Sequence, residues 1–216
     1  MCENAIENLL VEAYRSNSDI VEGSFKLFYG NNILSESHHK DESGIDYTLG
    51  KLRGFAWGKV FKSTLFKCIQ FPEEYWFEDT INAFLLFPIC SKVSTISSLV
   101  YCYRKNPQGI TSQSRKRVKS IDSYWIVEQM LSDMNLLKMN KTQSIYEQTL
   151  HQIKLTYSRT FFLDSKISKA IFILTVDLLH REFNGYHSLK HEWKTYENAL
   201  TKYDYGIYKL YGLLRG

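Results

Sequence analysis

The chain has 216 residues, enough for one domain with a full hydrophobic core or for two small domains. Its 27 basic and 23 acidic residues give a net charge of +4, which suits an anionic ligand or an acidic membrane surface but is too small to indicate nucleic acid. The four cysteines have no regular spacing, which indicates free thiols in a reducing compartment. Because no apolar run approaches the roughly 20 residues that cross a bilayer, and the N-terminus has no signal-peptide pattern, we expect a cytoplasmic protein.

The first part of the chain has the pattern of a mixed α/β structure. Apolar residues at helical spacing predict a helix over residues 3–16. The following segment predicts a strand over residues 19–29 and a turn at 30–32. Residues 35–50 are polar and without a period, so we expect a loop. Residues 54–62 are predicted to form a buried strand, whose two glycines indicate a bulge or a close approach of backbone or ligand.

Further along, the elements are expected to be shorter. Ser63 can cap a short helix over residues 63–69, and a second helix is expected over residues 79–90. Residues 94–103 have the composition of a strand, and a polar loop is expected over residues 104–120.

The remainder of the chain is predicted to be entirely helical. Residues 167–183 are apolar on nearly all sides, which predicts the central and most buried helix of this part. Asp164 or Ser165 can cap its start, and Asn184-Gly185 can end it.

Two neighbouring blocks of sequence have a specific pattern. The first is Gly54-Phe-Ala-Trp57-Gly58-Lys59, which leads through Phe71-Pro72 to Phe77-Glu78-Asp79-Thr80. The second is Ser98-Leu-Val-Tyr101-Cys-Tyr103-Arg104, followed by Gly109-Ile110-Thr111. In order and spacing, these blocks resemble the second half of the catalytic domain of bacterial family 2 glycosyltransferases, which have the GT-A fold. A helix and a strand like those predicted over residues 3–29 precede the blocks in that family.

The resemblance covers about residues 3–113 and implies a fold. It implies an α/β class: a partial GT-A-like (nucleotide-diphospho-sugar transferase) mixed sheet with helices in residues 1–113, followed by an all-α region in residues 114–216. No two aspartates are separated by one residue, so the family's metal-binding Asp-x-Asp motif has no counterpart. The family's first, nucleotide-binding strands have none either.

These two absences predict a truncated domain, whose missing half is supplied by a partner chain or by a homo-oligomer. The strand within residues 19–25 should then lack a neighbour in its sheet. An exposed apolar edge and self-association would follow.

The resemblance also implies a chemistry. The family transfers a sugar, with inversion, from a nucleotide-sugar donor to a saccharide or lipid-linked acceptor, typically in the synthesis of capsule or other surface polysaccharide. It makes Asp79 the candidate general base, with Glu78 beside it. The candidate substrate-binding residues are Trp57, Lys59, Arg104 and Thr111. The family is expected to use Mn²⁺ or Mg²⁺, but without Asp-x-Asp we assign no metal ligand. Peripheral contact with the inner face of the membrane is a further expectation.

Each candidate residue also has a purely structural interpretation. Carboxylates such as Glu78 and Asp79 are favoured at a helix start by the helix dipole, without any function. Trp57, taken alone, is more typical of a core residue. Arg104 suits a phosphate contact or a surface ion pair. We interpret Lys59 as a solvated strand residue, the alternative being a cation in the site.

Two polar segments are interpreted as surface. The basic run at residues 115–119 is interpreted as a solvated loop, although the corresponding loop of the resembling family can close over the donor. The adjacent His38 and His39 lack the spacing of metal ligands, so they too are interpreted as surface residues.

Two other classes of function stay open. The chain could be a non-catalytic interaction or scaffold module, in which the tyrosine-rich helices of residues 121–212 bind a partner protein. An RNA-binding function is disfavoured, because the basic residues cluster in one loop and no RNA-binding motif is present.

Overall fold

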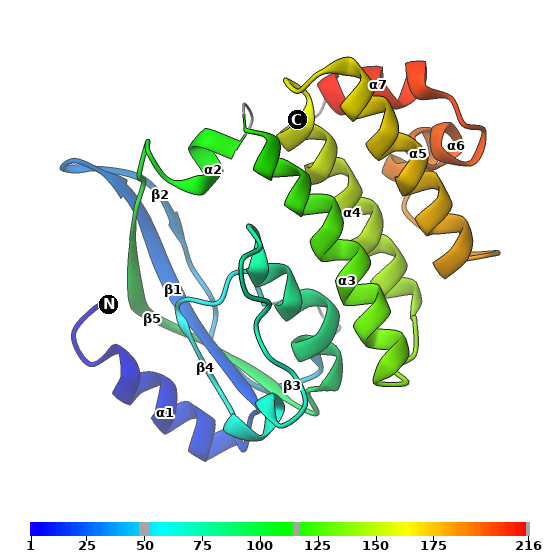
Figure 1. Ribbon diagram of the computed structural model, residues 1–216. Helices are drawn as coiled ribbons and strands as arrows, with labels where there is room; N and C mark the ends of the chain where they lie inside the picture. Colours follow the sequence, from blue (N-terminus) through cyan, green and yellow to red (C-terminus); the bar gives the residue numbers. More distant parts are fainter. Residues whose placement is uncertain (48–51, 115–116, 215–216) are drawn as a thin grey trace. The chain divides into compact units, whose positions relative to one another are not determined.

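Strand β1 (Ile20–Tyr29) is the centre of a mixed sheet (Figure 1). It runs parallel to β5 (Val93–Arg104), and antiparallel to both β2 (Asn32–Ser37) and β4 (Lys59–Phe61). Strand β3 (Glu42–Ile45) pairs with β5 and completes the sheet. The two long strands predicted from the sequence are therefore confirmed, and the sheet has the mixed α/β character that the sequence implied.

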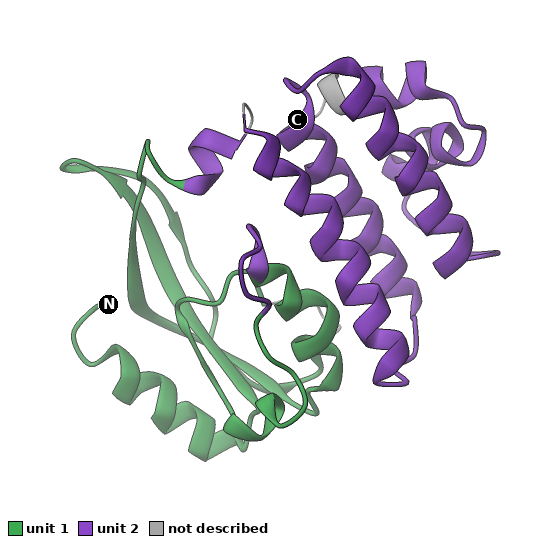
Figure 2. Ribbon diagram, viewed as in Figure 1, with its two compact units in different colours: residues 1–71, 79–109 green, residues 72–78, 110–216 purple. Residues whose placement is uncertain are grey.

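The computed structural model describes residues 1–47, 52–114 and 117–214, with side chains as far as residue 211. These residues form two compact units (Figure 2). The sheet unit comprises residues 1–71 and 79–109, and the helical unit comprises residues 72–78 and 110–216. The predicted division into residues 1–113 and 114–216 is contiguous along the chain. It does not separate out the segment 72–78, which belongs to the helical unit although it lies within the first predicted part.

The expectation that β1 lacks a neighbour is wrong. Residues Ile20 and Glu22 of β1 each have one partner on β4 and another on β5. Further along, Phe25 is paired with Ser37 of β2 and with Tyr101 of β5. Because β1 is paired on both sides along most of its length, it presents no apolar edge that would drive self-association.

The contact between β1 and β5 depends on a glycine. A Cβ atom at Gly23 would lie 2.5 Å from Cγ1 of Val100, so any larger residue would have to displace the Val100 side chain from its place on β5. Helix α1 (Ala5–Ser16) packs on this part of the sheet, and its buried residues Ala5 and Leu9 contact Val21, Ile96 and Val100. The helix predicted over residues 3–16 is thus confirmed, but only part of its apolar stripe faces the sheet, because Leu9 is buried whereas Ile6 and Leu10 are exposed.

Two predictions for the segment between β1 and β4 are wrong. Residues 35–50 were expected to form a loop, but they contain the end of β2 and all of β3. Strand β3 is polar because it is a short edge strand, and it is held by partners such as Asp41, which accepts a hydrogen bond of 2.6 Å from the backbone N–H of Ser97. Within residues 54–62 only Lys59–Phe61 is a strand, since the rest turns over the sheet.

The helices expected after β4 are replaced by short irregular turns. The first is a 3₁₀ turn, η2 (Ser63–Phe66), which begins after Lys62 and has no side-chain cap. The helix expected over residues 79–90 is divided into a 3₁₀ turn, η3 (Glu78–Thr80), a π-helical turn, η4 (Asn82–Leu86), and a second 3₁₀ turn, η5 (Phe87–Ile89). Pro88 lies in η5, where it cannot donate a helical hydrogen bond.

The longer part of the helical unit starts inside the expected loop over residues 104–120, with α2 (Ile110–Gln113) and a 3₁₀ turn, η7 (Val118–Ile121). Its long helices are α3 (Asp122–Leu136), α4 (Gln143–Thr160) and α5 (Ser165–Glu182). A 3₁₀ turn, η8 (His191–Trp193), leads to α6 (Lys194–Thr201) and α7 (Tyr205–Leu214). Asp164 caps α5 by accepting a hydrogen bond of 2.8 Å from the backbone N–H of Lys166, as predicted.

The central helix of this unit is α4, and not the apolar α5. Nine of the 18 residues of α4 are buried, against six of the 18 residues of α5, whose Ile173 and Leu174 are 50% and 37% exposed. The prediction was wrong because apolar composition alone does not show which sides of a helix its neighbours cover.

The tyrosines of the helical unit mostly fill its own core. Tyr196 and Tyr208 are fully buried, and their rings stack with centroids 5.3 Å apart. Tyr157 and Phe172 each pack on Tyr208 at 4.9 Å. These contacts account for much of the aromatic content of the C-terminal helices without a partner protein.

Glu182, at the end of α5, anchors an ion-pair network that predicts a pH dependence. It accepts hydrogen bonds from Asn135 at 3.1 Å and from Arg181 at 2.9 Å, and Lys141 contacts the same carboxylate. Burial by itself raises the pKa of Glu182, but the bonds from Lys141, Arg181 and Asn135 outweigh it and lower the pKa from 4.5 to about 2. Since the folded pKa is the lower one, this stabilisation is present above pH 4.5 and is lost as the pH falls towards 2.

We therefore expect this carboxylate to contribute about 3 kcal/mol of unfolding free energy that disappears over that acid range. The measurement is denaturant unfolding at a series of pH values, in the wild type and in Glu182→Gln. The difference between the two should shrink as the pH falls. Asp177→Asn is the matched control, because Asp177 is an exposed partner of the same Arg181. Parallel acid profiles for wild type and Glu182→Gln would contradict the assignment.

Candidate active site

A buried carboxylate, Glu22 on β1, is the centre of the candidate site. The register of β1 and β4 places Glu22 directly opposite Lys59, and the Lys59 Nζ lies 3.0 Å from Oε2 of Glu22. The Nε2 of His39 is 3.0 Å from Oε1, and the backbone N–H of Arg53 donates to Oε2 at 2.9 Å. The Glu22 side chain is therefore buried and contacted by three partners, which is how proteins keep a carboxyl group out of water.

Lys59 connects this carboxylate to the loop before β4. Its ammonium donates a hydrogen bond of 2.8 Å to the backbone carbonyl of Phe55 and lies 4.4 Å from the centre of the Phe55 ring. Burial lowers the pKa of Lys59, and the negative charges of Glu22 and Asp79 partly offset that shift. The interpretation of Lys59 as a solvated strand residue is wrong, since its side chain is completely buried.

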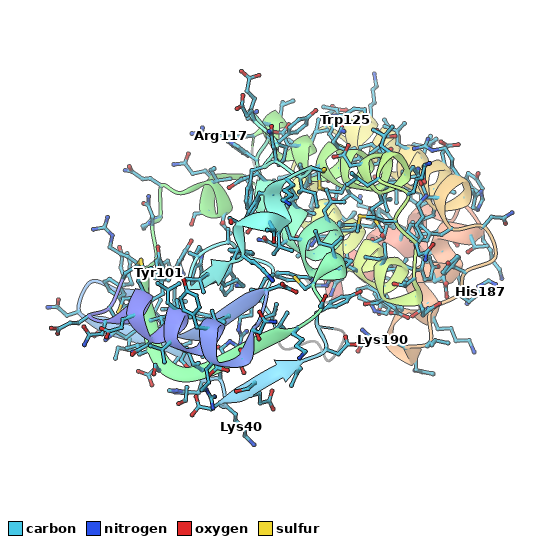
Figure 3. All side chains as sticks on the ribbon, turned by 90° about the horizontal axis from the view of Figure 1, so that it is seen from below. Lys40, Tyr101, Arg117, Trp125, His187 and Lys190 are labelled. Atoms are coloured by element: carbon cyan, nitrogen blue, oxygen red, sulfur yellow. The ribbon has the colours of Figure 1, made fainter. Side chains whose placement is uncertain are left out.

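An aromatic cluster in the same unit contacts the pair through the ring of Phe55. One of its members, Tyr101, is labelled in Figure 3. The rings of Phe55 and Trp57 stack with centroids 3.7 Å apart, and Tyr101 and Tyr103 of β5 stack on Trp57 at 4.7 and 5.0 Å. Gly58 has a φ of +72°, a conformation that favours glycine, at the step between Trp57 and Lys59. Trp57 is half-buried, so most of its ring is engaged within the protein.

Asp79 lies in the sheet unit, close enough to Lys59 for its charge to raise the pKa of that lysine. It is half-buried, whereas the preceding Glu78 is exposed and belongs to the helical unit. The amide of Asn82 donates a hydrogen bond of 2.8 Å to the carbonyl of Gly54, which ties the segment after Asp79 to the loop of Phe55. The two adjacent carboxylates therefore have different surroundings.

Arg104 and Thr111 are both exposed. Arg104 is the last residue of β5 and is paired in register with Phe28 of β1. Thr111 lies on α2 of the helical unit, so a contact between Thr111 and a substrate at the sheet unit stays a prediction. In the basic run, residues 115 and 116 lie outside the described part of the chain, while Lys119 lies 3.0 Å from Asp122 in an ion pair.

Glu22 and Arg53 were not among the residues predicted from the sequence, and the prediction that His39 is a surface residue is wrong. The ring of His39 is buried against Glu22, whereas the neighbouring His38 is exposed, as predicted. A signal for Glu22 was available, because a charged residue inside the apolar strand Ile20-Val21-Glu22 is rarely buried without a partner. Nothing in the local sequence indicates that His39 is that partner.

Two general features of the described residues, 1–47, 52–114 and 117–214, bear on the site. These residues contain no group of three or more histidine, cysteine, aspartate or glutamate side chains that could hold a metal ion. None of the helices among them combines the length and apolar character needed to cross a membrane.

No protein-family description matches the sequence, and no curated protein matches it. Among solved structures, the fold resembles that of TarS from S. aureus, a glycosyltransferase. The crystal structure of TarS with UDP-GlcNAc matches with a TM-score of 0.75 and 14% sequence identity, over 98% of this chain and 63% of that one. The TarS complex with UDP matches with a TM-score of 0.67 and 12% identity, over 96% of this chain and 61% of that one.

The chain therefore spans less than two thirds of the TarS chains that it matches. At this level of identity the likeness concerns the fold and not the activity. The chain has a glycosyltransferase-like α/β fold.

Proposed function

We propose that this chain forms the acceptor-side part of an inverting, family 2 type glycosyltransferase. The enzyme would transfer a sugar from a nucleotide-sugar donor to a saccharide or lipid-linked acceptor, in the synthesis of a surface polysaccharide. One observation carries the proposal. The negative charge of Asp79, the candidate base, acts on Lys59 of the buried Glu22–Lys59 pair, in a fold that TarS shares over 98% of this chain. That the TarS structure was solved with UDP-GlcNAc is consistent with a nucleotide-sugar donor.

Asp79 would act as the general base. Its carboxylate would take the proton of the acceptor hydroxyl while the acceptor oxygen attacks the anomeric carbon. The bond between that carbon and the diphosphate oxygen breaks on the opposite face, and the nucleoside diphosphate leaves. Being half-buried, Asp79 has access to solvent and also to the charge of Lys59, whereas the exposed Glu78 has the surroundings of an ordinary surface carboxylate.

Lys59 and Trp57 would mainly position the site. Because the Lys59 ammonium is buried between Glu22 and the Phe55 carbonyl, we infer that it orients the loop and biases the charge at Asp79 without touching the substrate. Trp57 is engaged by Phe55, Tyr101 and Tyr103, so only part of its ring is open to an acceptor sugar.

Positive charge on the leaving diphosphate would come from the exposed Arg104, with Thr111 as a second contact. The divalent cation that the family implies has no fitting donor set among the described residues, so no step of this proposal runs through a metal on this chain.

The first test is calorimetric titration of the chain with UDP-GlcNAc and then with other UDP- and GDP-sugars, with and without Mn²⁺ or Mg²⁺. We expect Arg104→Ala to weaken donor binding by about tenfold, the loss of one charge-assisted hydrogen bond. Lys105→Ala is the matched control, since it removes an exposed positive charge from the next residue. A folded chain that binds no nucleotide sugar would contradict a donor contact on this chain. Equal losses in the two variants would reduce the role of Arg104 to general electrostatics.

A further inference from the structure

The helical unit contains a groove of its own, lined by none of the residues of the candidate active site. Its volume is about 370 Å³, within the range of ligand pockets. It is lined by α3, α5 and the segment 72–78. The lining residues include Tyr75, Trp125, Glu128, Asn135, Arg181 and Glu182. Two of these are aromatic and open to solvent: Trp125 is 42% exposed and Tyr75 is 37% exposed. Trp125, on α3, is labelled in Figure 3.

The segment that carries Tyr75 is fixed in place within the helical unit. The backbone N–H of Trp76 donates to Oδ2 of Asp122 at 2.9 Å, and Lys119 donates to the carbonyl of Glu74 at 2.7 Å. The Phe77 ring is buried beneath the Arg159 guanidinium, which lies 3.7 Å from the ring centre.

The backbone on either side of Tyr75 is also unusual. Glu74 and Phe77 both have a φ of +67°, which is uncommon for residues other than glycine. Such conformations persist only where surrounding contacts enforce them, and they concentrate at ligand sites. Tyr75 is therefore presented to solvent at the groove by a pinned, strained segment.

The polar side chains of the groove are likewise held in fixed positions. Arg181 contacts Glu128 at 3.1 Å and Glu182 at 2.9 Å, and Asn135 donates to Glu182 at 3.1 Å. Carboxylate, guanidinium and amide groups are planar and can bond two neighbouring oxygen or O–H groups at once. Because these groups already hold one another, a ligand would meet them with little further loss of side-chain entropy.

The combination of groups indicates the class of ligand. A pyranose has an apolar face of C–H bonds and a rim of hydroxyls, which match exposed aromatic rings and planar polar groups respectively. A nucleotide or another phosphate would need unpaired positive charge, but the one guanidinium in the groove is shared between carboxylates. An apolar ligand would leave the charged groups without partners.

We propose that this groove binds a saccharide, as a second carbohydrate site distinct from the site of transfer. In the proposed glycosyltransferase its occupant would be a neutral stretch of the acceptor glycan, with one ring on Trp125 and its hydroxyls on Glu128, Arg181 and Asn135. A second site of this kind raises the affinity for a long acceptor through effective concentration, without changing the reacting groups.

The experiment begins with an array of neutral and acidic bacterial surface polysaccharides and their oligosaccharide fragments, incubated with the full chain. The oligosaccharide that binds best is then titrated by calorimetry, with no nucleotide sugar present. We expect Trp125→Ala to weaken this binding at least about tenfold, the usual cost of truncating an aromatic hot spot. Trp125→Phe should keep most of the affinity, because the aromatic face remains.

Phe162→Ala is the matched control: Phe162 is an exposed aromatic residue of the same unit, 59% exposed, and does not line the groove. It should bind the oligosaccharide like the wild type. Binding of no array saccharide, or equal binding by Trp125→Ala and wild type, would overturn the inference. Donor titration of Trp125→Ala separates the two proposals, since nucleotide-sugar binding should be unchanged in this variant whether or not the groove binds glycan.

Discussion

Asp79→Asn is expected to lower the rate of sugar transfer by about 10²–10⁴-fold, the usual contribution of a general base. Asparagine has nearly the same shape as aspartate but cannot take the proton of the acceptor hydroxyl. The measurement is release of the nucleoside diphosphate from the donor identified by calorimetry, with and without a saccharide acceptor. Donor binding should change little, because the lost interaction forms only as the proton moves.

Glu78→Gln is the matched control for this prediction. Glu78 is the adjacent carboxylate, is exposed, and lies in the other compact unit, so its neutralisation should change the rate only slightly. Equal rate losses in Glu78→Gln and Asp79→Asn would indicate a general effect of negative charge and not a base. Full activity of Asp79→Asn would remove the residue from the mechanism.

Lys59→Met is expected to lower the free energy of unfolding by about 3 kcal/mol, because it leaves the buried carboxylate of Glu22 without its ammonium partner. Methionine fills a similar volume, so the loss reflects charge more than packing. Denaturant unfolding followed by circular dichroism measures the change. The double variant Lys59→Met with Glu22→Gln should recover part of the loss, since the uncompensated charge is then removed.

A second lysine on the same unit provides the control. Lys62 pairs with Asp19 at 3.2 Å but is 47% exposed, so Lys62→Met should cost less than about 1 kcal/mol. The Glu22–Lys59 assignment would be contradicted by equal losses in Lys59→Met and Lys62→Met. It would also be contradicted if the double variant Lys59→Met with Glu22→Gln lost more unfolding free energy than the two single variants lose together.

Comparing Asp79→Asn with Lys59→Met distinguishes a residue that acts in the reaction from one that stabilises the fold. The first should leave stability nearly intact and remove turnover. The second should lower stability and, through the loop of Phe55 and the charge at Asp79, also lower turnover.

Much of the fold could be predicted because local pattern and final packing agree. The strands over Ile20–Tyr29 and Val93–Arg104 and the helix over Ala5–Ser16 each carry apolar residues at the spacing of their element, and each buries part of them. The Asp164 cap of α5 is likewise a local feature, fixed by a hydrogen bond two residues away. Prediction failed where the local sequence pattern and the final packing disagree. Strand β3 is too polar to be recognised from its sequence, and η4 departs from the helix expected over residues 79–90.

For the candidate site, the kinds of residue and their order along the chain could be read from the sequence. The Glu78-Asp79 pair, the Trp57-Gly58-Lys59 step and Arg104 were all identified from pattern and resemblance. The burial of Lys59, and its sharing of the Glu22 carboxylate with His39, became visible only in the folded chain. Strand register joins residues far apart in the chain, and burial of a charge depends on those distant partners, which local periodicity does not record.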